Sequence, residues 1–193
     1  MILIIANYRT GSTTFAQELG GTGEEHLQDH IYRPPNSIWE DGKKFLPRPH
    51  VYKIMPDQFE YEKNYESFKK DYIEKAKKIY YTLREDINAQ IESNMYASVT
   101  ADWHPHGVGW NELASEEEQE KGKKFWGEGS GNIKTLFKNL EWQRNIYKEF
   151  GGELVWLENR NYNPRSMGKY RRRSDYTPDK FNYDINVREM FYE

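Results

Sequence analysis

A short run of branched apolar residues near the start of the chain places the strongest constraint on its fold. Residues 2–6 read Ile-Leu-Ile-Ile-Ala, with no polar residue among them. A strand that is apolar on both sides fits the interior of a parallel sheet, where helices cover both faces. Residues 7–14 then supply a turn rich in hydroxyl side chains, and residues 15–19 carry apolar residues at helical spacing before Gly20 and Gly21. The beginning of the chain therefore predicts a strand, a loop and a helix in succession.

The same alternation continues along the chain. Short runs rich in branched and aromatic residues predict three further strands, at residues 51–55, 79–83 and 153–157. Apolar residues at helical spacing predict three further helices, at residues 65–78, 86–100 and 133–150. Strands that alternate with helices are typical of an α/β fold, so we expect a three-layer α/β/α arrangement with a central parallel sheet. A length of 193 residues fits a single domain.

Three stretches carry no clear periodicity. Residues 22–50 contain four prolines and predict a long connection, which in compact domains is often functional. Residues 102–130 are rich in glycine, tryptophan and charged residues, and we interpret them as an insertion or lid. Past Glu158 the pattern fades, and we expect residues 159–193 to form a basic C-terminal tail. Six cations and no acidic residue occur between residues 160 and 173, which suits either a solvated surface or an anion-binding segment.

The aliphatic content is low for a folded protein. Isoleucine, leucine, valine and phenylalanine together make up only 37 of the 193 residues, a level near which chains begin to be disordered. The formal net charge of −3 and an aromatic content of 16% argue against disorder, because each buried ring removes about 150–250 Å² from water. We therefore expect a small core rich in aromatic residues.

Composition also excludes several classes of protein. The chain has no cysteine, which excludes disulfide scaffolds, thiolate metal sites and cysteine nucleophiles. The mean hydropathy is −1.04 and no apolar run approaches the roughly 18 residues of a membrane span. Residues 1–6 lack the basic residues and the length of a signal peptide. We therefore expect a soluble cytoplasmic protein with no membrane partner.

The loop between the first strand and the first helix has the chemistry of an anion site. Gly11 permits close approach of the backbone, the start of a helix presents N–H groups, and Ser12, Thr13 and Thr14 add hydroxyl donors. Arg9 adds a guanidinium that can bind the same oxygens. The alternative is an ordinary turn in which a Ser or Thr caps the helix without any ligand. The triphosphate-binding pattern Gly-x-x-x-x-Gly-Lys-Ser/Thr is absent from the loop.

Residues 8–15 resemble the 5′-phosphosulfate loop of the sulfotransferase family, whose pattern is basic-Ser/Thr-Gly-Ser/Thr-Thr after the first strand. Arg9 falls on the basic position of that pattern. The resemblance implies that the loop holds the 5′-phosphosulfate of 3′-phosphoadenosine 5′-phosphosulfate (PAPS). The residues that it assigns to this role are Arg9, Thr10, Gly11, Ser12, Thr13 and Thr14.

A second segment resembles the part of the same family that binds the 3′-phosphate. In residues 80–86, Arg84 directly follows the strand predicted at residues 79–83, and Ser93 lies on the next predicted helix. The resemblance implies that Arg84 and Ser93 share the 3′-phosphate, a compact dianion that suits a guanidinium and a hydroxyl. The alternative for Arg84 is a surface ion pair with Glu85 or Asp86.

The resemblance extends over about residues 1–160 and is strongest to a bacterial branch of the family. It implies the P-loop nucleoside-triphosphate-hydrolase-like fold of sulfotransferases. It also implies that Arg165 and Gly168 belong to a C-terminal loop over the 3′-phosphate.

Sulfuryl transfer needs an acceptor oxygen in line with the S–O bond, stabilisation of the leaving phosphate and a base for the acceptor proton. We assign Arg9 to the leaving charge and Lys53 to a secondary cation. One branch of the family takes its base from a Lys-x-His strand end, but here Met55 replaces the histidine. The bacterial branch uses an acid after the first helix, and Asp29 or His30 occupies that place here. Three neighbouring residues are alternative candidates: Glu24, Glu25 and His26.

These observations predict an enzyme that transfers a sulfuryl group from PAPS to a hydroxyl of a carbohydrate or small metabolite, leaving 3′,5′-ADP. One alternative is a P-loop nucleotide kinase-like enzyme, which would need ATP and Mg²⁺. Another is a non-catalytic or degenerate nucleotide-binding homologue, and a third is a module whose basic segment binds nucleic acid or another polyanion. We rank nucleic acid below a small-molecule partner. We expect no metal, because His104 and His106 fall short of a three-ligand site.

Overall fold

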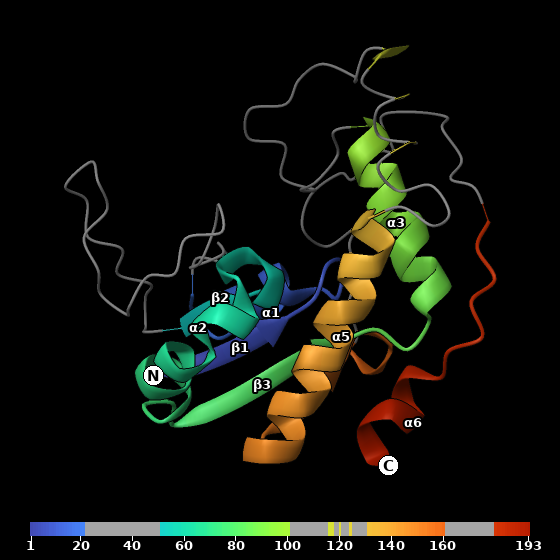
Figure 1. Cartoon of the computed structure of the whole chain (residues 1–193). Helices are drawn as coiled ribbons and strands as arrows, with labels where there is room; N and C mark the ends of the chain where they lie inside the picture. The colour runs from blue at the N-terminus through green and yellow to red at the C-terminus, as the bar shows by residue number, and fades with distance from the viewer. Residues whose placement is uncertain (22–50, 101–115, 118–119, 121–123, 125–130, 161–179) are drawn as a thin grey trace.

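Four parallel strands form one sheet in the order β2-β1-β3-β4 (Figure 1). The computed structural model describes residues 1–21, 51–100, 116–117, 120, 124, 131–160 and 180–193. The strands are β1 (Ile2–Ala6), β2 (Val51–Ile54), β3 (Lys78–Leu83) and β4 (Glu153–Trp156). Ile2 of β1 pairs with Val51 on one side and with Lys78 on the other. The predicted parallel sheet is confirmed, and each predicted strand agrees with the observed one to within a residue.

Helices flank this sheet. They are α1 (Ser12–Glu18), α2 (Tyr61–Phe68), α3 (Ile87–Thr100), α5 (Gly131–Phe150) and α6 (Val187–Tyr192). Three shorter helical turns are η1 (Pro56–Phe59), the π-helical η2 (Lys69–Ile73) and η3 (Leu157–Asn159). Gly151 follows α5 with a φ of 66°, a left-handed conformation that glycine adopts without strain. The protein is therefore an α/β protein with an all-parallel sheet.

Two helical predictions differ from the structure. The helix predicted at residues 65–78 begins at Tyr61 and passes into the π-helical η2, which ends at Ile73. The second difference is α6, because the sequence pattern predicts no helix after Glu158. Asn186 caps α6 by accepting a hydrogen bond from the backbone N–H of Glu189. The last part of the expected basic tail is therefore a packed helix.

Alternate residues of β1 point to opposite faces of the sheet. Leu3 and Ile5 pack with α2, η2 and α5, whereas Ile4 and Ala6 pack with Ala16 of α1. Because β1 has helices over both faces and a strand at each edge, it is buried from Leu3 onward. This burial explains why the run is apolar without alternation.

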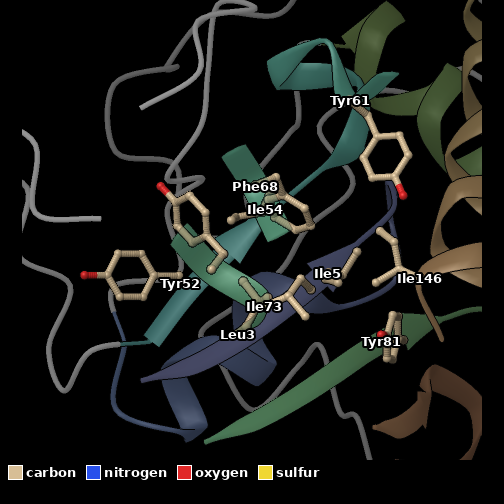
Figure 2. Packing of buried hydrophobic residues seen from close by; sticks show 10 residues of the cluster. Leu3, Ile5, Tyr52, Ile54, Tyr61, Phe68, Ile73, Tyr81 and Ile146 are labelled. Carbon is tan, nitrogen blue, oxygen red and sulfur yellow. The ribbon is translucent and has the colours of Figure 1, made fainter. Parts of the chain in front are cut away.

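Ten buried residues on the α2 face form what we call the aromatic cluster. Figure 2 shows it around β1, β2 and β3. Its members are Leu3, Ile5, Tyr52, Ile54, Tyr61, Phe68, Tyr72, Ile73, Tyr81 and Ile146. Phe68 stacks on Tyr72 with ring centroids 5.6 Å apart, and Tyr52 meets Tyr72 edge to face at 5.8 Å. Aromatic rings thus supply much of the core that the low aliphatic content leaves unfilled.

A second core cluster joins α3, α5, β4 and α6. Ile91 and Met95 of α3 pack with Leu140 of α5, and α3 runs beside α5 in Figure 1. Val187 and Phe191 of α6 are buried in the same cluster. Within the described part of the chain, no helix is both long enough and apolar enough to cross a membrane.

Candidate functional site

The strand order creates a topological switch point between β1 and β3. The chain leaves β1 through α1 toward β2 on one side, whereas it leaves β3 through α3 and α5 toward β4 on the other side. In open α/β sheets, ligands bind at the carboxyl ends of the two strands where the connections diverge. Arg9 follows β1 and Arg84 follows β3, so the two predicted phosphate-binding segments flank this position.

Buried polar side chains gather at the same edge of the sheet. We call them the polar layer: Asn7, Thr10, Ser12, Lys53, Thr82, Gln90, Asn94, Asn139 and Gln143. They include every buried polar residue of the described ranges. Burying polar groups costs free energy unless they are hydrogen-bonded. Among the described residues, their concentration at one edge therefore makes that edge the candidate for a role other than packing.

Side chains from three elements hold the backbone of the loop after β1. The Thr10 hydroxyl donates to the carbonyl oxygen of Asn7 at 2.8 Å, Gln90 donates to that of Tyr8, and Arg160 donates to that of Gly11 at 3.2 Å. Arg9 and Gly11 both adopt left-handed conformations, with φ of 56° and 71°. Turns of this kind direct successive N–H groups to one side, an arrangement that binds anions.

The loop hydroxyls do not all face a ligand. Thr10 is buried, and its Oγ1 lies 2.9 Å from Oγ1 of Thr82 on β3. Its side chain therefore ties the loop to β3, and only its backbone can serve the predicted phosphosulfate site. Thr13 Oγ1 accepts a hydrogen bond from Lys53 Nζ at 2.9 Å. This contact brings the predicted secondary cation on β2 to the first turn of α1.

Arg9 joins the two predicted phosphate segments. Its Nε donates to Ser93 Oγ at 3.0 Å, so Ser93 contacts the arginine of the first segment. The resemblance instead implies that Ser93 works with Arg84. Arg84 Nε lies 3.9 Å from the carboxylate of Glu158, which also accepts hydrogen bonds from the backbone N–H of Glu85.

Arg84 lies in an environment that disfavours its charge. Burial lowers the pKa of Arg84 from its ordinary value, and the positive charge of Arg9 lowers it further, against the opposing effects of Glu158 and Asp86. Two cations that oppose each other in a partly desolvated place are stabilised by an anion between them. The pair at the switch point is therefore suited to a multiply charged anion.

A carboxylate that the sequence did not single out lies beside the loop. Asp57 Oδ2 accepts a hydrogen bond from the Tyr8 hydroxyl at 2.5 Å, and Oδ1 accepts one from Asn139 Nδ2 at 2.6 Å. The backbone N–H of Asp57 donates to Asn139 Oδ1 at 3.0 Å. These bonds connect η1, the loop after β1 and α5 at the edge of the sheet that carries the polar layer.

The polar layer left one signal in the sequence. Gln90 and Asn94 are four residues apart on α3, and Asn139 and Gln143 are four residues apart on α5. In each pair, two amide side chains occupy the buried side of an otherwise apolar helical pattern. Such a pair indicates that the buried side of the helix faces a polar group, but the sequence does not identify that group.

Several predicted residues lie outside the described part of the chain. They are the base candidates Asp29 and His30, with their neighbours Glu24, Glu25 and His26, the C-terminal loop residues Arg165 and Gly168, and His104 and His106. Among the described residues, no three His, Asp or Glu side chains are grouped as metal ligands. The predicted site residues that belong to the described part of the chain are thus the cations and hydrogen-bond donors near the ends of β1 and β3.

Comparison with known protein families, curated proteins and solved structures finds no match to the chain. The residues and geometry at the carboxyl edge of the sheet are therefore the basis for proposing a function.

Proposed function

We propose that the protein is a PAPS-dependent sulfotransferase that acts on a hydroxyl of a carbohydrate or small metabolite. In this proposal the sheet and its helices are a three-layer α/β/α unit of the P-loop type. The observation that carries it is the placement of Arg9 and Arg84 after adjacent strands at the topological switch point, with Ser93 bonded to Arg9. These are the residues through which the chain resembles the family.

The described residues fit the charges of PAPS. The nucleotide carries one anionic group on each side of its ribose, and the site offers one arginine after each strand. Arg9 and the loop backbone would hold the 5′ group, while Arg84 would hold the 3′-phosphate. The opposition between the two cations, which contributes to the lowered pKa of Arg84, would be relieved by such a ligand.

We assign catalysis to positioning and charge stabilisation. The acceptor oxygen forms a bond to sulfur while the bond from sulfur to the 5′-phosphate oxygen breaks, and the electron pair stays on the phosphate. Arg9 would stabilise that charge, with Lys53 as the second cation behind Thr13. Asp29 and His30 stay the candidates for the base. Both oxygens of Asp57 already accept hydrogen bonds from protein side chains, so we assign it to holding Tyr8.

Calorimetry with 3′,5′-ADP tests the proposal. The wild-type protein should bind it, and Arg9→Ala and Arg84→Ala should each weaken binding by at least about tenfold, since each loses a charged hydrogen bond. Lys69→Ala is the matched control, because Lys69 pairs with Glu149 far from the polar layer. Absence of binding to the wild-type protein would contradict the proposal.

The same titrations separate the alternatives. Preference for ATP with Mg²⁺ over 3′,5′-ADP would favour the kinase-like enzyme. Binding of a polyanion that falls steeply with salt and survives Arg9→Ala would favour the nucleic-acid module. Binding of 3′,5′-ADP without any release of it from PAPS in the presence of a panel of hydroxyl acceptors would favour the non-catalytic homologue.

A further inference from the structure

Arg160 connects the end of β4 to both ends of α1. Its Nη1 donates to the carbonyl oxygen of Gly11, just before α1, at 3.2 Å. Its Nη2 lies 2.6 Å from both carboxylate oxygens of Glu18, the last residue of α1. Between these contacts the guanidinium lies over the ring of Phe15, 5.1 Å from the centroid. One guanidinium therefore contacts the residue before α1, a ring within α1 and the last residue of α1.

The bond to Gly11 helps to hold a peptide plane of the loop, whose carbonyl oxygen also accepts a hydrogen bond from the backbone N–H of Phe15 at 3.1 Å. Because the peptide unit is planar and trans, holding the Gly11 carbonyl also holds the Ser12 N–H, which points the opposite way. The neighbouring Leu157 reinforces this placement, since its Cδ1 would lie only 2.7 Å from a Cβ at position 11. Gly11, at φ 71°, is therefore confined by the chain that follows β4.

The charge of Arg160 is already balanced. Only 14% of its side chain is exposed, and its Nη2 forms an ion pair with the Glu18 carboxylate at 2.6 Å. Both carboxylate oxygens contact this one nitrogen, and charge-assisted hydrogen bonds of this kind are stronger than neutral ones. The guanidinium therefore orients the loop instead of offering its charge to a ligand, although it is the first cation of the basic segment at residues 160–173.

We propose that Arg160, held by Glu18, is a positioning residue for the loop that binds the 5′ group of the nucleotide. This inference rests on the proposed function, and it assigns to the residues after β4 the task of keeping the loop N–H groups in place. In this inference, Arg9 and Arg84 bind the charged groups of the nucleotide, whereas Arg160 holds the loop backbone in the conformation that binds them.

Replacing Glu18 distinguishes positioning from simple electrostatics because the two predict opposite signs. Glu18→Ala removes a negative charge near the site, so electrostatics alone would tighten the binding of an anion. If Arg160 is a positioning residue, freeing it should weaken binding of 3′,5′-ADP by about tenfold. Glu18 is 56% exposed, so this variant should fold. Glu153→Ala is the matched control, since it removes a carboxylate from the amino end of β4.

A second nucleotide separates loop positioning from general loss of structure. Adenosine 3′-phosphate lacks the 5′ group, so its affinity should stay within about twofold in Glu18→Ala and in Arg160→Lys, which keeps the charge but loses the fork. Unchanged or tighter binding of 3′,5′-ADP to Glu18→Ala, or equal weakening of both nucleotides, would overturn the inference.

Hydrogen exchange decides the case in which the nucleotide assignment itself fails. If the wild-type protein binds neither nucleotide, the proposed function is wrong. The positioning role still predicts faster amide exchange at residues 12–15 in Glu18→Ala, with no change at residues 79–83 of β3. Unchanged exchange at residues 12–15 would then refute the role of Arg160 as well.

Discussion

The aromatic cluster and the polar layer are both buried, but they are built from opposite chemistries. The cluster beneath α2 consists of apolar and aromatic side chains, which gain free energy by leaving water. The polar layer, at the carboxyl edge of the same sheet, consists of amides, hydroxyls and one lysine. Each of these groups loses hydration on folding and needs a hydrogen bond to compensate.

That compensation is incomplete in the polar layer. Within the described part of the chain, Gln90 Oε1, Gln143 Oε1 and both polar atoms of Asn94 are buried without a hydrogen-bond partner. An unsatisfied buried polar group costs about 1–3 kcal/mol. We infer that the aromatic cluster supplies the stability of the fold and that the polar layer uses part of it for the site. The four predictions below test this division.

The largest effect should follow from removing a ring of the aromatic cluster. Phe68 is fully buried and contacts both Tyr61 and Tyr72, so Phe68→Ala should lower the free energy of unfolding by about 3–5 kcal/mol. Urea denaturation measures the loss. Calorimetry on the folded fraction should show the same affinity for 3′,5′-ADP as in the wild type. A change in affinity without a change in stability would contradict the division.

Arg84→Ala should produce the reverse pattern. We expect the affinity for 3′,5′-ADP to fall by about 10- to 100-fold, because the variant loses the charged hydrogen bond that the proposed function assigns to Arg84. The free energy of unfolding should change little, because burial and Arg9 already disfavour the charged side chain. Calorimetry and urea denaturation on one preparation measure both quantities. A large loss of stability would show that Arg84 has a structural role.

Two asparagines of the polar layer should respond oppositely to the same substitution. Asn94→Leu removes an amide without partners and should raise the free energy of unfolding by about 1 kcal/mol. Asn139→Leu leaves Asp57 without two hydrogen bonds and should lower it by about 2 kcal/mol. Thermal or urea unfolding measures both variants, and each variant serves as the control for the other. Equal changes in both variants would refute the hydrogen-bond argument.

The smallest effect concerns alkaline pH. Burial raises the pKa of Tyr81 well above its ordinary value of 10, with smaller contributions from Tyr61 and Tyr147. The unfolded tyrosine therefore loses its proton first, so stability is full below pH 10 and falls as the pH rises above it. Tyr81 should account for about 0.8 kcal/mol of loss between pH 9 and 10.5. In Tyr81→Phe the wild-type loss should shrink by that amount, and an identical pH profile would contradict the assignment.

The sequence predicts the sheet well because a buried strand requires apolar residues at consecutive positions, and such a run is visible in the sequence itself. A central parallel strand needs branched apolar residues on both faces, and residues 2–6 fit that position. The start of α2 was placed four residues late because Tyr61 lies just after a proline-led turn, although it continues the helical spacing of Tyr65 and Phe68. The helix α6 was missed although Asn186 and Glu189 have the spacing of a cap.

The sequence predicts which loop could bind an anion, but it does not predict which side chains contact one another there. A glycine and hydroxyl residues between a strand and a helix suffice to mark the loop as an anion site. Which side chains meet there depends on where separate elements lie, and this is why Ser93 was assigned to Arg84 although it contacts Arg9. For the same reason the sequence does not predict that the Thr10 side chain lies 2.9 Å from the Thr82 hydroxyl.

The position of β1 in the sheet has a consequence for how the chain folds. β1 is made before its partners, yet Ile2 pairs with Val51 on one side and Lys78 on the other. An apolar strand with two open edges stays unprotected until both neighbours are available, and such distant pairings slow folding. During synthesis this apolar strand is therefore exposed until β2 and β3 are available, and we expect the insertion of β1 between them to limit the rate of refolding.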